Sequence, residues 1–230
     1  SSMPLLKALG ILIKTRADQN IMKVFKKAED NMYENKLVES QSSRNAFLVT
    51  LKATLQKKNE IPDEHIAYLQ NLAYNFGEAA HLQGSDLDRF VLLVAFHDIG
   101  NIAIPDDILK KPNSLNDEDW SNIRKHPEIG YRIARTIDEL SGIAYAILAH
   151  HEYWDGSGYP QGLQGEDIPL LSRLNAIVTA YYAMTRKKKH SGEEIYSKAR
   201  ALKELKSYAG KQFDPELVNS FIDMMKKMPE

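Results

Sequence analysis

Helical periodicity runs through almost the whole chain and limits the folds that it can adopt. Apolar residues recur at intervals of three and four, the spacing of one helix face, in stretches such as Ile66, Leu69, Leu72, Ala73 and Phe76. Three helix starts carry the residues of a capping box, Ser85 with Asp88, Asn116 with Asp119 and Ser191 with Glu194. Strand character is confined to residues 8–14, "ALGILIK". We therefore predict an all-α fold, with one short strand near its beginning.

Charge and composition exclude several classes of partner. The chain has 230 residues and a formal net charge of −1, which gives no electrostatic argument for binding nucleic acid or an anionic membrane. No apolar run approaches the ~20 residues of a membrane span. The first residues also lack the basic and apolar segments of a signal peptide, so we expect a cytoplasmic location. The sequence has no cysteine, so any metal must be held by His, Asp and Glu.

Two pairs of adjacent polar residues close apolar segments. His97 and Asp98 follow "FVLLVAF", and His150 and His151 lie near the end of a helix predicted over 139–154. Burying imidazoles and a carboxylate is costly unless they are paired or bound to a cation. Neighbours on a helix point about 100° apart, so two adjacent histidines would share only a wide cavity. The spacing alone leaves two readings open, a metal site for Fe, Mn, Zn or Ni and helix caps.

Several motifs in order make the chain similar to a known family. "HDIG", "HPEIGYRIA", "ILAHHEYWDGSGYPQGLQGEDIPLLSRL" and "FDPELV" together resemble an HD-GYP domain, which belongs to the HD superfamily of metal-dependent phosphohydrolases. The resemblance implies an HD-superfamily helical bundle over residues 41–230. It also implies that the domain acts on cyclic di-GMP, so this nucleotide is the expected small-molecule partner.

The resemblance assigns a role to each matching residue. It implies that Asp98 is the catalytic residue, bridging two divalent transition metals. The implied metal ligands are His65, His97, Asp98, His126, His150 and His151. The implied substrate contacts are Gly158, Tyr159, Pro160, Arg173 and Lys188. On this basis a metal-held hydroxide would attack the phosphodiester in line.

A second, shorter resemblance precedes the first. The segment "VFKKAEDNMYENKLVES" is similar to the last helix of a GGDEF diguanylate cyclase domain, so residues 1–40 are expected to be its remnant and to add an extra N-terminal helix. This implies an upstream GGDEF domain as a partner in the full-length protein. The exposed apolar face of such a helix needs a partner, and we expect either a homodimer or packing near Phe47 and Leu51.

Four positions depart from the family pattern. Asn101 replaces a lysine, Lys188 replaces an arginine, and Thr179 and Tyr182 replace two aspartates. A neutral hydroxyl offsets no metal charge, so we expect incomplete metal occupancy and impaired hydrolysis. The alternatives are a variant enzyme with other ligands, and a degenerate module for ligand binding, protein interaction or regulation of an attached cyclase. The sequence leaves open whether any hydrolysis remains.

Overall fold

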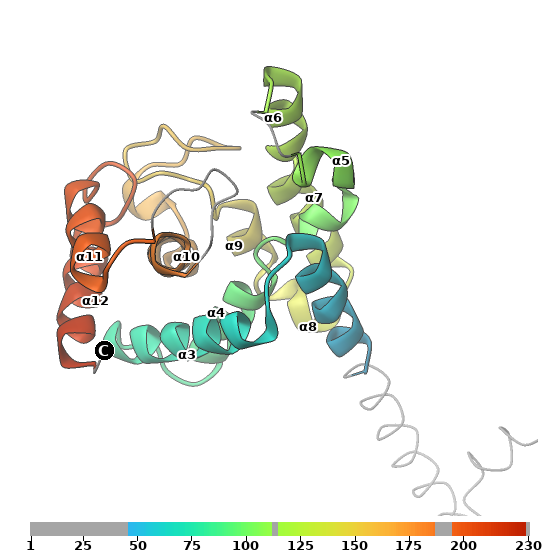
Figure 1. Cartoon of the computed structure of the whole chain (residues 1–230). Coiled ribbons are helices and arrows are strands. Elements are labelled where there is room, and N and C mark those ends of the chain that lie inside the picture. Colours follow the sequence, from blue (N-terminus) through green and yellow to red (C-terminus); the bar gives the residue numbers. More distant parts are fainter. Residues whose placement is uncertain (1–45, 112–114, 187–194, 229–230) are drawn as a thin grey trace, which may run out of the picture. The chain divides into compact units, whose positions relative to one another are not determined.

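The computed structural model describes residues 46–111, 115–186 and 195–228 (Figure 1). The chain divides into two units, residues 1–53 and 54–230. Residues 46–59 are helical, so this helix crosses the boundary between the units. The predictions made for residues 1–40, including the strand at 8–14, lie outside the described residues, and so does Lys188.

Helices account for nearly all regular structure in the described part. In chain order these are α3 Asp63–Ala79, α4 Ser85–Phe96, η1 Ile99–Ala103, α5 Asp106–Leu109, α6 Asp117–Ile123, α7 His126–Arg135, α8 Asp138–Ser141, α9 Ala144–Leu148, η2 Gly165–Asp167, α10 Leu170–Thr185, α11 Lys198–Ser207 and α12 Pro215–Lys227 (Figure 1). The described residues form no β-strand, only an isolated bridge between Ala209 and Phe213. The predicted all-α fold is therefore confirmed. None of the described helices is long and apolar enough to cross a membrane.

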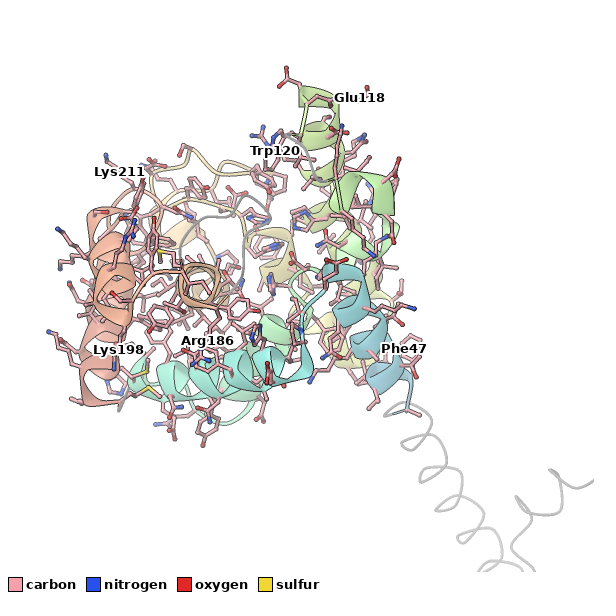
Figure 2. All side chains as sticks on the ribbon, viewed as in Figure 1. Phe47, Glu118, Trp120, Arg186, Lys198 and Lys211 are labelled. Atoms are coloured by element: carbon pink, nitrogen blue, oxygen red, sulfur yellow. The ribbon has the colours of Figure 1, made fainter. Side chains whose placement is uncertain are left out.

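The main core lies where α3, α4, α10, α11 and α12 pack together. Phe76 of α3 is fully buried, and its ring packs edge-on against Phe90 of α4 and Phe221 of α12, with centroid distances of 6.4 and 4.9 Å. Side chains fill the space between these helices (Figure 2). The periodic face predicted for residues 66–76 is the buried face of α3. Trp120 on α6 is exposed, at 47% of its surface (Figure 2).

Of the three predicted capping boxes, Ser191 with Glu194 lies outside the described residues, and one of the other two is present. Asn116 accepts a hydrogen bond from the backbone of Asp119, and the Asp119 carboxylate accepts one from the backbone of Asn116. The prediction at Ser85 is wrong, because α4 is capped by Gly84 without a side-chain bond. Gly84 has a φ of 53°, which is unlike the extended backbone of a capping serine. The helix therefore begins at Ser85 and not after it.

The helix predicted over 139–154 is broken in two places. It is divided into α8 and α9, and α9 ends at Leu148. Gly142 and Ile143 separate the two helices, and residues 149–151 form a turn. His150 and His151 therefore lie beyond the helix, so the 100° offset between neighbouring helical side chains does not apply. The rings of His150 and His151 lie 4.1 Å apart, centroid to centroid, and need no wide cavity.

Candidate metal centre

Asp98, His126, His150 and His151 converge on one point. Each offers one ligand atom, and these atoms all lie within 4.8 Å of one another. The Nε2 atoms of His126 and His150 are 3.1 Å apart, and they lie 3.5 and 3.7 Å from Oδ1 of Asp98. His126 and His150 are buried, with 3% and 5% of their surface exposed. The structure thus brings four of the six sequence-predicted ligands into one group.

A close backbone approach makes this convergence possible. Gly100 lies in η1, two residues after Asp98, and a Cβ added to it would lie 1.9 Å from the carbonyl oxygen of His126. A Cβ added to Gly130, on α7, would lie 3.3 Å from the backbone N of Gly100. Only glycine lets η1 lie this close to the beginning of α7. Gly100 therefore brings Asp98 within reach of His126.

Backbone carbonyls fix the orientation of three imidazole rings. In each case Nδ1 contacts the carbonyl oxygen three residues earlier, at His97 with Val94 (3.0 Å), His126 with Ile123 (2.7 Å) and His150 with Ile147 (2.5 Å). Each of these carbonyls lies in the last turn of a helix, where carbonyls lack an intrahelical partner. A carbonyl can only accept, so Nδ1 carries the proton and Nε2 keeps its lone pair.

The donor set fits a divalent transition metal. The Nε2 lone pairs of His126 and His150 face each other and the Asp98 carboxylate across 3.1 to 3.7 Å. When both rings are neutral, a cation among these atoms would resolve the repulsion between their lone pairs. Imidazole and carboxylate donors are typical ligands of Zn, Fe, Mn and Ni. The bonds from Nδ1 to the carbonyls are the outer-shell contacts that metal-ligating histidines usually make.

Burial and neighbouring charges keep the side chains of His126, His151 and Asp98 in the protonation states that can bind a metal. Burial lowers the pKa of His126 to about 4, although the Asp98 carboxylate opposes this shift. Burial also lowers the pKa of His151 well below its usual value. Burial raises the pKa of Asp98, but His97, His150 and His126 outweigh that effect and hold this pKa well below its usual range. Near neutral pH His126 and His151 are therefore neutral and Asp98 is ionised.

His97 and His65, the other two sequence-predicted ligands, lie beside this group. Nε2 of His97 is 3.5 Å from Oδ2 of Asp98, and its ring is 5.4 Å from the ring of His150, centroid to centroid. His65 lies on α3, and its Nδ1 is 3.0 Å from the hydroxyl of Tyr182 on α10. Tyr182, at a position where the resemblance expects an aspartate, therefore forms a hydrogen bond with one ring nitrogen of His65.

Thr179 on α10 is turned to its own helix. Its hydroxyl donates to the carbonyl of Asn175, at 2.8 Å, which is a common arrangement for threonine within a helix. Among the described His, Asp and Glu residues, α10 contributes none to the metal-binding group.

The glycine-rich loop packs on the group through Tyr159. The Tyr159 ring stacks on His151, with centroids 4.9 Å apart and an angle of 17°, and the Arg124 guanidinium lies 5.6 Å from the Tyr159 ring. Burial raises the pKa of Tyr159 to about 12, so its hydroxyl stays protonated. The peptide bond between Tyr159 and Pro160 is cis. A Cβ on Gly158 would lie 2.2 Å from the backbone N of Tyr153, which explains the glycine.

Two carboxylates that the sequence analysis did not single out hold this loop. Glu152 is buried and accepts from the backbone N–H groups of Gln161 (2.7 Å) and Leu163 (3.1 Å). Asp214 accepts from Arg173 at 2.8 Å, and Arg173 also donates to the carbonyl of Ile168. Arg173, predicted as a substrate contact, is thus engaged by Asp214. An acidic residue directly after the histidine pair was the one available signal for Glu152.

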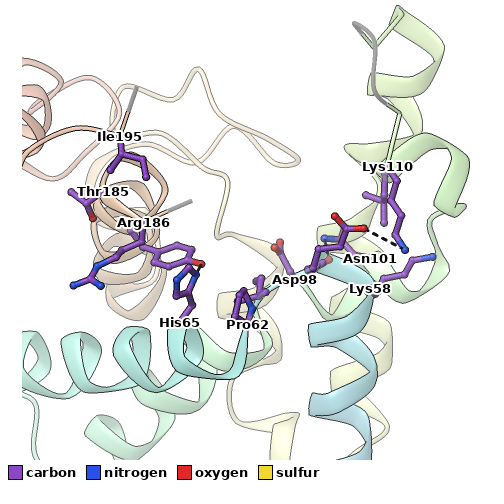
Figure 3. Close-up of a pocket in the computed structure, with 14 residues that line it drawn as sticks. Lys58, Pro62, His65, Asp98, Asn101, Lys110, Thr185, Arg186 and Ile195 are labelled. Atoms are coloured by element: carbon purple, nitrogen blue, oxygen red, sulfur yellow. Dashed lines mark hydrogen bonds and ion pairs between the residues drawn. The ribbon is translucent and has the colours of Figure 1, made fainter. Parts of the chain in front are cut away.

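A cavity of about 590 Å³ opens beside Asp98 (Figure 3). Its lining includes His65, Tyr182, Asp98, Asn101, Lys58 and Lys110. This volume is within the range of small-molecule sites. The metal-binding group and the cavity therefore share Asp98.

Comparison with known proteins identifies relatives over most of the chain. The family model described as HD domain matches residues 43–217. A 3'3'-cGAMP-specific phosphodiesterase 2 of Vibrio cholerae is 37% identical over 162 residues, 68% of this chain and 31% of that protein. A cyclic di-GMP phosphodiesterase of Thermotoga maritima is 36% identical over 191 residues, 80% of this chain and 51% of that protein. The chain thus spans about a third to a half of the length of these relatives.

Two solved structures share the fold. A cyclic GMP-AMP specific phosphodiesterase of V. cholerae superposes with a TM-score of 0.60 at 20% identity, over 79% of this chain and 48% of that chain. An HDG"Y"P protein from Bdellovibrio bacteriovorus superposes with a TM-score of 0.55 at 19% identity, over 89% and 64% of the two chains. At these identities the likeness concerns the fold alone.

Proposed function

Because the chain belongs to the HD domain family, we propose that it is a cyclic di-GMP signalling domain of the HD-GYP type, with impaired hydrolysis. The observation that carries the proposal is the group of Asp98, His126, His150 and His151, whose ligand atoms lie within 4.8 Å of one another. Relatives named as cyclic di-GMP and cyclic GMP-AMP phosphodiesterases support a cyclic dinucleotide as the ligand.

Each residue of the group has a role in this proposal. Asp98, His126, His150 and His151 hold one divalent transition metal, which when bound supplies a Lewis acid and lowers the pKa of a bound water. His97 and His65 lie next to this ion, and Asp98 is the catalytic residue because it faces both the ion and the cavity. Gly158, Tyr159 and Pro160 form the wall against which a nucleotide base can pack. Arg173, held by Asp214, donates to the carbonyl of Ile168 at the end of this loop.

The proposed loss of hydrolysis follows from Thr179 and Tyr182 on α10 and from Asn101. Hydrolysis of a phosphodiester by a two-metal site needs a second cation, and the resemblance implies that an aspartate at position 179 would help to hold it. Thr179 bonds to its own helix and Tyr182 bonds to His65, so neither offers a charged ligand. Asn101, in place of a lysine, brings no positive charge to the phosphate. We therefore propose that one metal binds firmly and that turnover is close to background.

A degenerate regulatory module is the second candidate. The bond between His65 and Tyr182 favours it, because that bond engages one ring nitrogen of a predicted metal ligand with a hydroxyl. In this form the domain would bind the nucleotide without cleaving it and regulate an attached cyclase. The similarity of residues 1–40 to the end of a GGDEF domain supports such an attachment, and we propose 41–230 as the HD-GYP domain.

The test is metal analysis and an activity assay on the same purified sample. We expect one transition metal per chain, binding of cyclic di-GMP, and turnover near background for cyclic di-GMP and 3'3'-cGAMP. Two metals per chain with robust turnover, abolished by His150→Ala, would contradict the impairment. Absence of binding to either cyclic dinucleotide by the metal-loaded chain would contradict the proposal as a whole.

A further inference from the structure

Asn101, which replaces a charged residue of the family pattern, makes a hydrogen bond of its own. It is nearly buried, with 9% of its surface exposed, and its side-chain amide donates to the side-chain oxygen of Asn59 at 3.1 Å. Asn59 belongs to the helix over 46–59, and both residues line the cavity beside Asp98. Asn101 is therefore hydrogen-bonded to the helix over 46–59, at the position where the resemblance expects a lysine.

Two lysines from different segments belong to the lining of the cavity. Lys58 and Lys110 both line it, on the side of Asn101 (Figure 3). The Lys58 side chain is 16% exposed and that of Lys110 is 38% exposed. Two ammonium groups thus belong to the side of the cavity that holds the neutral Asn101, and the lining also includes Arg186 and Glu60.

One carboxylate holds both ammonium groups. Lys58 pairs with Oδ1 of Asp106, and Lys110 lies 3.2 Å from Oδ2 of the same residue. Lys110 is also 3.8 Å from Glu60. The two lysines are the main reason that the pKa of Asp106 is lowered. Asp106 therefore occupies the position of a bidentate anion between two cations.

We propose that Lys58 and Lys110 form a phosphate-binding site in this cavity and take over the contact that Asn101 cannot make. The inference rests on the proposed function, since it names residues that would bind the nucleotide. The ligand is the phosphodiester anion of a nucleotide, whose oxygens accept charge-assisted hydrogen bonds from ammonium groups. The Asp106 side chain is 57% exposed, so it can return to water when a phosphate displaces it.

A purely structural ion pair is the alternative that the test must exclude. In that case the lysines only fasten the end of the helix over 46–59 to α5. The substitution Asp106→Asn separates the two readings by the sign of its effect. It releases both lysines, so a phosphate site gains affinity, whereas a structural pair loses thermal stability and leaves affinity unchanged.

The experiment measures affinity calorimetrically on the metal-loaded full chain at fixed ionic strength, with cyclic di-GMP and GMP as probes. We expect Lys58→Met and Lys110→Met each to weaken binding about tenfold or more, the worth of one charge-assisted hydrogen bond. Methionine keeps the apolar stem of the lysine, so packing is retained. Lys57→Met is the control, because Lys57 is exposed and does not line this cavity. Asp106→Asn should strengthen binding.

The outcomes separate this inference from the proposed function. Cyclic di-GMP affinity that is unchanged in both lysine variants would overturn the inference and leave the proposed function standing. Lysine-dependent binding of GMP without binding of cyclic di-GMP would support the phosphate site and overturn the proposed function. A chain that binds neither probe would overturn both.

Discussion

The Nε2 atoms of His126 and His150 lie 3.1 Å apart, although both rings already use their Nδ1 atoms on backbone carbonyls. Two neutral imidazoles in this arrangement present lone pairs to each other. The contact is unfavourable for the protein alone and favourable once a cation lies between the rings. Stability of this part of the molecule should therefore depend on metal.

Metal removal should destabilise the protein. A ligand that binds only the native state adds stability in proportion to the logarithm of its concentration over its Kd, and ~100-fold excess over Kd adds about 2.7 kcal/mol. We expect chelation to lower the Tm by several degrees, measured by calorimetry. His150→Ala should make the Tm insensitive to chelation. His81→Asn is the control, because His81 lies outside the group and asparagine tolerates its φ of 63°.

Restoring charged groups should restore turnover. Thr179→Asp with Asn101→Lys places a carboxylate on α10 and a cation near the cavity, and loss of one such group commonly costs 10²–10³-fold in rate by order of magnitude. We expect cyclic di-GMP turnover to rise well above that of the unmodified chain, together with a second bound metal. Asn101→Lys alone adds no metal ligand and should leave the metal content at one. Robust turnover before any substitution would refute the premise.

A methyl group at Gly100 should disrupt the centre. In Gly100→Ala the added Cβ would lie 1.9 Å from the carbonyl oxygen of His126, and a backbone atom cannot move away as a flexible side chain can. We expect a loss of about 2 kcal/mol or more in unfolding free energy and a weaker metal affinity, measured by denaturation and metal titration. Gly142→Ala is the matched control, since its Cβ would meet only the flexible Arg89 side chain at 3.2 Å. Equal effects in both variants would disprove this account.

Acid should destabilise the metal-free protein in a defined range. Burial lowers the pKa of His126 from 6.5 to about 4, so between these values the unfolded chain binds more protons than the native one. Stability is then complete above pH ~6.5 and decreases by roughly 3 kcal/mol as the pH falls to 4. Asp98, whose pKa is also lowered, adds a further loss at lower pH. Denaturant unfolding of chelated protein from pH 4 to 8 measures this slope, and His126→Gln should reduce it.

Local sequence chemistry predicted most of the helices, and the family resemblance implied the residues of the metal-binding group. The apolar repeat of α3 and the capping box of Asn116 with Asp119 are set by neighbours within a few residues, so the sequence shows them directly. The pairing of His65 with Tyr182 joins residues 117 positions apart. No periodicity encodes that pairing, because it depends on how α3 and α10 pack.

The errors have the same physical origin. The break between α8 and α9 and the turn before His150 depend on packing around Gly142 and Ile143, while the local sequence reads as one continuous helix. The role of Arg173 as a substrate contact stays a prediction, and its bond to Asp214, 41 positions away, forms only in the folded chain. Lys58 and Lys110 lie in segments without a recognisable motif, so the sequence did not single them out. Only the folded chain brings both of them to one cavity.

The bonds from imidazole Nδ1 to carbonyls three residues earlier have one more consequence. They make the orientation of each ring a property of its own helix end, settled before the helices meet. Metal binding then costs little side-chain entropy, because the rings are already oriented. The free energy of metal binding therefore depends mainly on how α4, α6, α7 and α9 pack together. A metal titration of this chain would therefore measure how well these helices are packed. Any signal that moves the helices relative to one another would change the metal affinity.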